Sequence, residues 1–179
     1  AMDLRVEKTK RSIINAFLEL RAKKPLEKIT VKELCEHDWI HKSTFYSHYT
    51  DIYDLSEQLE TETVNSIIQT LPHPETIFEN PAEFTEALFL AYRSQDTLSQ
   101  ILFSGSRRGQ LIAKTKAQLR DLVLRTYPEY EQDPIRNIVL SYAIYGSYYA
   151  YTENRHYGED MVISALGQLT QAVTWTFSE

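Results

Sequence analysis

The chain has 179 residues, 42% of them hydrophobic and 12% aromatic, which predicts a folded protein with a sizeable core and excludes a disordered one. No apolar run approaches the roughly 18 residues that a membrane-spanning helix needs, and the single cysteine excludes a disulfide framework. The net charge of −6 is uneven, because residues 1–54 hold ten Lys and Arg against nine Asp and Glu and the remainder holds nine against sixteen. The net charge argues against a protein that coats nucleic acid without selectivity. A near-neutral N-terminal part on an acidic remainder suits a protein that presents only its N-terminal part to phosphate.

Few glycines and prolines, together with a persistent period of 3.6 residues, predict an all-α chain of about nine helices. Asn80 and Asp133 each precede a proline, which is typical of a capping residue before the first helical position. The helices expected in chain order lie at about residues 5–23, 30–37, 42–49, 52–70, 81–93, 95–104, 108–126, 134–153 and 159–177.

The second expected helix begins with a capping box. Thr30 would cap the helix, and the Glu33 side chain would reach back to the N–H of the cap. Leu34 and Cys35 fall on the buried side, so we expect Cys35 to be a core residue and not a redox sensor.

The third expected helix has one apolar position, Phe45, among polar neighbours. Its outward side carries hydroxyls, an amine and an imidazole, which can bond to phosphates and base edges alike. Two short helices joined by a tight turn and braced by a longer helix predict a helix-turn-helix. Composition alone fits an ordinary solvated helix face equally well.

Residues 29–55, which read ITVKELCEHDWIHKSTFYSHYTDIYDL, resemble the DNA-binding signature of the TetR/AcrR family of bacterial transcriptional regulators. The resemblance implies a DNA-binding domain at residues 1–50 and a helical regulatory and dimerisation domain at 51–179. It also implies a homodimer that binds a palindromic operator in double-stranded DNA and acts as a repressor. The single cysteine fits a reducing cytoplasm, which is the location we expect. The DNA contacts that it implies are Thr30, Lys32, His41, Lys42, Ser43, Thr44, Tyr46, Ser47, His48 and Tyr49.

The sequence departs from the family pattern at two places. Trp39 stands in the turn where the family usually has glycine or another small residue. The fourth helix of the family usually opens with a phosphate-binding lysine, but residues 50–54 here read Thr-Asp-Ile-Tyr-Asp.

The last two expected helices carry apolar faces wider than a monomer of this size readily covers. The family resemblance implies that they pair with their copies. The small residues Gly146 and Ala150, and likewise Ala165 and Gly167, would allow a neighbouring helix to approach closely. Residues 142–158, YAIYGSYYAYTENRHYG, also resemble a C-terminal segment of Firmicute members of the family. The alternative is that both faces pack within the monomer. The interface residues expected are Tyr142, Tyr145, Gly146, Tyr149, Val162, Leu166, Leu169 and Val173.

The family resemblance further implies an effector cavity in the body of the chain, although each candidate residue is explained equally well by an ordinary hydrophobic core. The sequence leaves open whether the effector is a small molecule or a protein partner. We expect Arg107 and Arg108 to be a solvated pair in a loop. The cavity residues expected are Leu88, Phe89, Tyr92, Leu102, Phe103, Leu119 and Val123.

No enzyme motif is present, neither a phosphate-binding loop nor a dinucleotide fingerprint nor a nucleophile elbow. The five histidines and the cysteine lack metal-ligand spacing. We therefore expect no catalysis, cofactor, metal or membrane partner. A rival hypothesis is a helical protein-interaction module with little or no DNA affinity, for which the acidic body would be the binding surface.

Overall fold

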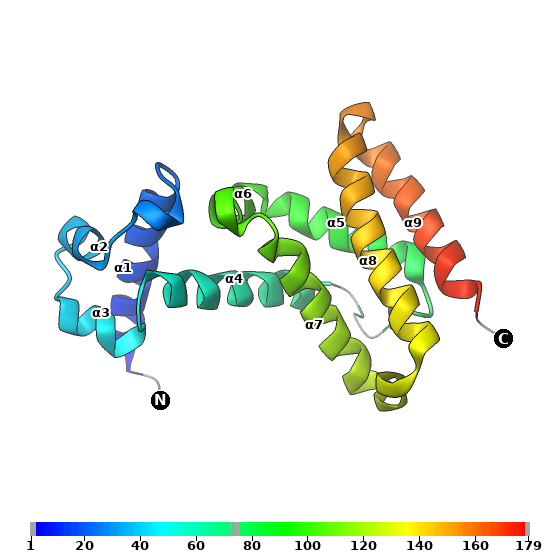
Figure 1. The fold of residues 1–179 in the computed structure, drawn as a ribbon, viewed down its shortest axis with the longest axis horizontal. Helices are drawn as coiled ribbons and strands as arrows, with labels where there is room; N and C mark the ends of the chain where they lie inside the picture. Colours follow the sequence, from blue (N-terminus) through cyan, green and yellow to red (C-terminus); the bar gives the residue numbers. More distant parts are fainter. Residues whose placement is uncertain (1–2, 72, 74–75, 178–179) are drawn as a thin grey trace. The chain divides into compact units, whose positions relative to one another are not determined.

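The structure, a computed structural model, describes residues 3–71, 73 and 76–177. Within these residues it contains nine α-helices and no strand, so the all-α prediction is confirmed (Figure 1). The helices are α1 (Leu4–Arg21), α2 (Val31–His37), α3 (Lys42–His48), α4 (Ile52–Gln69), α5 (Pro81–Ser94), α6 (Asp96–Leu102), α7 (Gln110–Thr126), α8 (Pro134–Asn154) and α9 (Glu159–Trp175).

Each helix begins and ends within two residues of the expected bounds, because local signals set the ends. Asp133 caps α8 as expected, with its carboxylate accepting a hydrogen bond from the Arg136 N–H at 3.1 Å. Asn80 precedes Pro81 at the start of α5 but makes no capping hydrogen bond through its side chain. Pro81 suits the first position of α5, because the N–H that a proline lacks would have no partner within the helix at that position.

The described residues pack as two compact units, and the first consists of residues 3–63 and 97–111. It contains α1, α2, α3, α6 and the N-terminal part of α4. Phe17 from α1, Leu34 from α2, Phe45 from α3, Leu55 from α4 and Leu102 from α6 are all fully buried. These units follow packing and not function, so the functional boundary expected at residue 50 stays a prediction.

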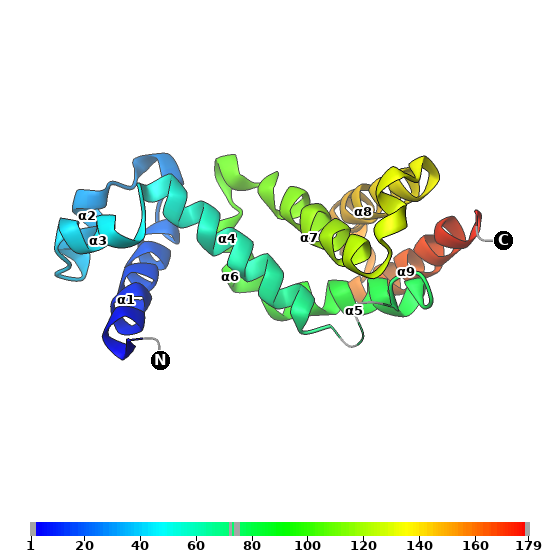
Figure 2. The same cartoon turned by 90° about the horizontal axis from the view of Figure 1, so that it is seen from below.

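The second unit consists of the described parts of residues 64–96 and 112–179. In it α9 packs along both α5 and α8, which the two ribbon views show (Figures 1 and 2). A Cβ atom at Gly167 would lie 2.9 Å from Oε1 of Glu86 and 3.1 Å from the carbonyl oxygen of Ala82. The close approach expected at Gly167 therefore involves α5 of the same chain. No helix in the described part of the chain is long and apolar enough to cross a membrane.

Candidate nucleic-acid interface

Helix α2 begins at a side-chain cap. The Thr30 hydroxyl accepts a hydrogen bond from the Glu33 N–H at 3.1 Å, as the sequence predicts. The Glu33 carboxylate, expected to reach back to the cap, forms an ion pair with the Lys24 ammonium. Cys35 is buried as predicted, and burial raises the pKa of its thiol, opposed by the charge of Lys42. The thiol is therefore protonated at neutral pH, which suits a core residue.

The turn between α2 and α3 is closed by Trp39 in the left-handed conformation, with φ at 54°. The Ile40 N–H donates to the Cys35 carbonyl at 2.9 Å, the long hydrogen bond that closes a Schellman motif at a helix C-terminus. Glycine usually occupies this position because a side chain there crowds the backbone. Trp39 thus replaces the glycine without changing the backbone conformation that glycine normally supplies.

Helix α3 has one buried side and one exposed side. Phe45 is 0% exposed and Tyr49, which directly follows the helix, is 3% exposed. On the opposite side four residues are exposed, at spacings that place them on one face of the helix. These four residues, the α3 face, are Lys42, Ser43, Tyr46 and Ser47.

The α3 face combines different kinds of donor. Tyr46 is 55% exposed, and its ring packs edge-on against Phe45 at a centroid distance of 5.4 Å, which limits how the ring can move. The Ser47 hydroxyl donates to the Thr44 carbonyl at 2.6 Å and keeps its lone pairs as acceptors. Lys42 contributes the cationic group. A face of this kind can bond to phosphates and to base edges.

The remaining predicted DNA contacts lie in different environments. Thr30 and Lys32 are exposed at the start of α2, and His41 is exposed just before α3, where its imidazole takes no part in capping. Thr44 and His48 are half-buried. Tyr49 packs against Phe45 in the core, and burial, with the charges of Glu62 and Asp54, raises the pKa of Tyr49 to about 12. Among the ten residues, Tyr49 has the least surface to offer a ligand.

The acidic start of α4 is explained by capping. The Asp51 carboxylate accepts from the Asp54 N–H at 2.8 Å, and the Asp54 carboxylate accepts from the Thr50 N–H at 2.8 Å. The Thr50 N–H and the Gln58 amide hold the pKa of Asp54 below its usual value. These carboxylates fix the position at which α4 begins.

Arg107 forms ion pairs with two glutamates of the first unit. Its Nη2 lies 2.6 Å from Oε1 of Glu60 and 2.7 Å from Oε2 of Glu57, and the Ser56 hydroxyl donates to Glu60 at 2.7 Å. The side chain of Arg107 is 18% exposed and that of Glu60 is 0% exposed. The prediction that Arg107 and Arg108 form a solvated pair is therefore wrong for Arg107, whereas Arg108 is exposed as predicted.

A second arginine fastens the same segment to α1. Arg21 is 4% exposed, and its Nη2 donates to the Ser104 hydroxyl at 3.0 Å and to the Leu102 carbonyl at 3.4 Å. Its Nη1 donates to the Lys24 carbonyl at 3.1 Å. Burial lowers the pKa of Arg21, opposed by nearby carboxylates. Two arginines therefore tie residues 102–107 to α1 and α4.

The expected cavity residues divide between the units. Leu102 and Phe103 are buried in the first unit, and the other five lie on α5 and α7 in the second. In the second unit the Tyr92 hydroxyl lies 2.5 Å from the Thr115 hydroxyl, and burial raises the pKa of Tyr92 to about 12. That these residues line a cavity stays a prediction.

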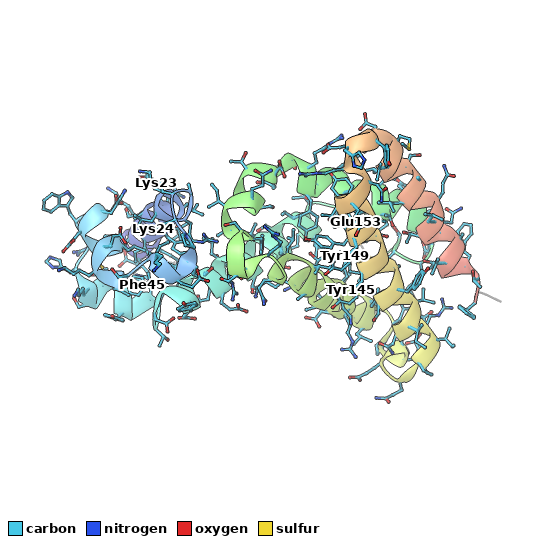
Figure 3. The ribbon with its side chains drawn as sticks, turned by 45° about the horizontal axis from the view of Figure 1, so that its top comes forward. Lys23, Lys24, Phe45, Tyr145, Tyr149 and Glu153 are labelled. Atoms are coloured by element: carbon cyan, nitrogen blue, oxygen red, sulfur yellow. The ribbon has the colours of Figure 1, made fainter. Side chains whose placement is uncertain are left out.

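The α8 helix exposes an apolar stripe. Ile135, Ile138, Tyr142, Tyr145 and Tyr149 are between 37% and 66% exposed, and they recur at helical spacing. Figure 3 shows Tyr145 and Tyr149 following one another along the same side of α8.

The other residues expected at the dimer interface differ in exposure. Gly146 on α8 is exposed, and a Cβ atom added there would meet nothing within 4 Å. On α9, Leu169 is 61% exposed and Val173 is half-buried. Val162 and Leu166, at 6% and 5%, belong to the core of their own chain.

No group of three or more His, Cys, Asp or Glu residues that could hold a metal occurs in the described residues. Comparison of the chain with protein-family models, with curated proteins and with solved structures gave no match.

Proposed function

We propose that the chain is a sequence-specific DNA-binding regulator of the TetR/AcrR type, in which α2 and α3 form a helix-turn-helix. The observation that carries the proposal is the α3 face, with Lys42, Ser43, Tyr46 and Ser47 exposed opposite the buried Phe45. A short helix anchored on one side and covered with donors on the other is suited to a major groove, which admits one α-helix.

The proposed protein binds as a homodimer. The exposed apolar stripe on α8 supports this, with Tyr142 66% exposed and Ile138 61% exposed. A second copy of the chain packed on α8 would bury these side chains. Because Val162 and Leu166 are buried in their own chain, the proposed interface uses the other six residues named for it. Two α3 helices placed about 34–36 Å apart would reach successive major grooves of a palindrome.

Regulation in this proposal is repression relieved by an effector, either a small molecule or a protein partner. The effector acts by favouring a dimer in which the two α3 helices have another separation. A differential affinity of about 1–3 kcal/mol between the two states is enough for a useful switch.

The experiment is selection of duplex DNA from a random pool by the purified protein, followed by titration of the enriched duplex at several salt concentrations. We expect a palindrome to be enriched and Lys42→Ala to lower the salt slope by about one. Tyr46→Phe removes a single hydroxyl and should weaken binding roughly tenfold. Arg155→Ala, which removes an exposed cation in the second unit, is the matched control and should bind as the unsubstituted protein does.

Failure to enrich any duplex, with weak binding only at low salt, would overturn the proposal in favour of a helical protein-interaction module. Tight binding by both Lys42→Ala and Tyr46→Phe would instead show that α3 is not the reading helix. Steep salt dependence separates the two functions, since phosphate contacts release counterions and a protein partner shows no such slope.

A further inference from the structure

Trp39 is unfavourable for the fold in two independent ways. Its side chain is 94% exposed, the highest exposure among the large hydrophobic residues of the described chain. Its backbone has φ at 54°, a conformation that costs a bulky residue more than it costs glycine. Neither feature stabilises the protein, and strained residues of this kind concentrate where a ligand is bound.

The position of Trp39 favours one kind of partner. It precedes Lys42, the first residue of the α3 face, by three residues. The exposed residues nearest to it in the sequence are polar, namely His37, Asp38, His41 and Lys42, and the half-buried Ile40 is the one apolar neighbour. Tryptophans that anchor protein interfaces instead sit among desolvated apolar contacts. The polar surroundings of Trp39 therefore favour a charged, hydrated ligand.

Two carboxylates close to Trp39 in the sequence each have a basic side chain nearby. Oδ1 of Asp38 lies 3.4 Å from Nδ1 of His37. Oε1 of Glu36 lies 3.9 Å from the Lys32 ammonium, one helical turn away.

We propose that the indole of Trp39 binds the sugar–phosphate backbone of DNA beside the groove that α3 enters. The ring face packs on a deoxyribose, and the Nε1–H, the only donor of the side chain, bonds to a phosphate oxygen. Such a contact positions the protein on the duplex and carries no sequence information. This inference rests on the proposed function and adds to it a residue outside the recognition helix.

The test compares Trp39→Gly, Trp39→Asn and Trp39→Phe on two probes, a duplex enriched from a random pool and a shuffled duplex of the same composition. Glycine and asparagine accept the left-handed backbone but lack the ring. We expect both variants to bind the two probes about tenfold more weakly, with the salt slope unchanged because no cation is lost. Trp39→Phe keeps a ring without the N–H and should be intermediate. The midpoint of thermal unfolding of Trp39→Gly should rise by roughly 2–4 °C, which excludes misfolding as the cause.

Fluorescence supplies a direct readout. In a Trp175→Phe background Trp39 is the single tryptophan, and the substituted residue lies on α9 in the second unit. Adding either duplex should quench the Trp39 emission and shift it to shorter wavelength, since the indole leaves water. Trp175→Phe itself should bind DNA unchanged.

The outcomes separate the inference from the function on which it rests. If the unsubstituted protein binds neither duplex, the proposed function fails. If it binds while Trp39→Gly binds equally well and the emission stays constant, the inference is overturned and the function stands. Loss of discrimination between the two probes in Trp39→Gly would also overturn it, because a backbone contact lowers both affinities equally. A Trp39-dependent protein partner, found with DNA binding intact in the variants, would assign Trp39 to that partner.

Discussion

The guanidinium of Arg107 and the carboxylate of Glu60 form a two-pronged ion pair, with Nη2···Oε1 at 2.6 Å and Nε···Oε2 at 2.9 Å. The pair joins α4 to residues 47 positions later in the chain, and the Glu60 side chain is 0% exposed. Removing one partner of a buried pair leaves an uncompensated charge, which typically costs about 3–5 kcal/mol. Arg107→Ala should therefore lower the free energy of unfolding by about 3 kcal/mol or more, measured by urea denaturation at neutral pH.

The matched control is the exposed pair of Lys10 and Glu62, whose charged atoms lie 3.2 Å apart with side chains 38% and 53% exposed. Lys10→Ala should cost less than about 1 kcal/mol. The double variant Glu60→Leu with Arg107→Met removes both charges and should recover most of the loss. Equal losses in Arg107→Ala and Lys10→Ala would contradict a buried role for Arg107.

Two tyrosines with raised pKa values, the buried Tyr49 and the half-buried Tyr92, should make the protein less stable at high pH. Burial raises the pKa of Tyr49 and of Tyr92 to about 12, whereas an unfolded tyrosine ionises near about pH 10. Their contribution to stability is complete below pH 10, and it is lost as the pH rises toward 12, because only the unfolded state releases the proton in this window. The free energy of unfolding should fall by roughly 2 kcal/mol per tyrosine by pH 12.

This prediction is checked by urea denaturation at intervals across the alkaline range. Tyr49→Phe and Tyr92→Phe should each flatten the decline, since a phenylalanine has no proton to release. Tyr157→Phe, at a residue 67% exposed, should leave the decline unchanged. An identical decline in all three variants would show that other groups cause it.

Two glycines should respond to alanine in opposite directions. Gly146 lies in the middle of α8, and within the chain nothing lies within 4 Å of a new Cβ. In the monomeric Tyr142→Lys background, Gly146→Ala should therefore stabilise the fold by about 1 kcal/mol through helix propensity. At Gly167 the new Cβ would meet Glu86 and the Ala82 carbonyl, and overpacking of this kind costs about 1–3 kcal/mol. Thermal unfolding of both variants tests the prediction, and an undisturbed Gly167→Ala would contradict the close packing of α5 on α9.

The proposed dimer interface can be tested with two tyrosines of nearly equal exposure. Tyr142 on α8 is 66% exposed and Tyr157, just beyond the helix, is 67% exposed. Tyr142→Lys should shift the protein from dimer to monomer in sedimentation velocity, because a lysine in the centre of an apolar interface must lose its hydration. Tyr157→Lys should leave the association state unchanged. If the unsubstituted protein is itself a monomer in sedimentation velocity, the proposed dimer interface is wrong.

Local features of this fold are predictable from sequence. The helix ends depend on neighbouring residues, such as Asp133 before Pro134, and so they fall within two residues of expectation. The burial of Phe45 and Cys35 also follows, because the few apolar residues of a short helix with polar neighbours share the one side that faces the core.

The unpredicted features depend on residues distant in sequence. The burial of Arg107 needs Glu60, which no local pattern connects to it. Val162 and Leu166 share the period of the exposed α9 residues, so periodicity alone does not tell which of them face α5 and α8 and which face solvent. Trp39 is visible as a departure from the family pattern, but its left-handed backbone depends on the hydrogen bond between Ile40 and Cys35.

The first unit is discontinuous, since residues 97–111 return to it after the chain has built α5. A gene fragment ending at Thr63 would encode α1, α2 and α3 but would omit Leu102 from their core and leave Glu60 without its guanidinium. A fragment that keeps the proposed DNA-binding surface together with its supporting residues must therefore extend to Leu111, and so it carries α5 as well.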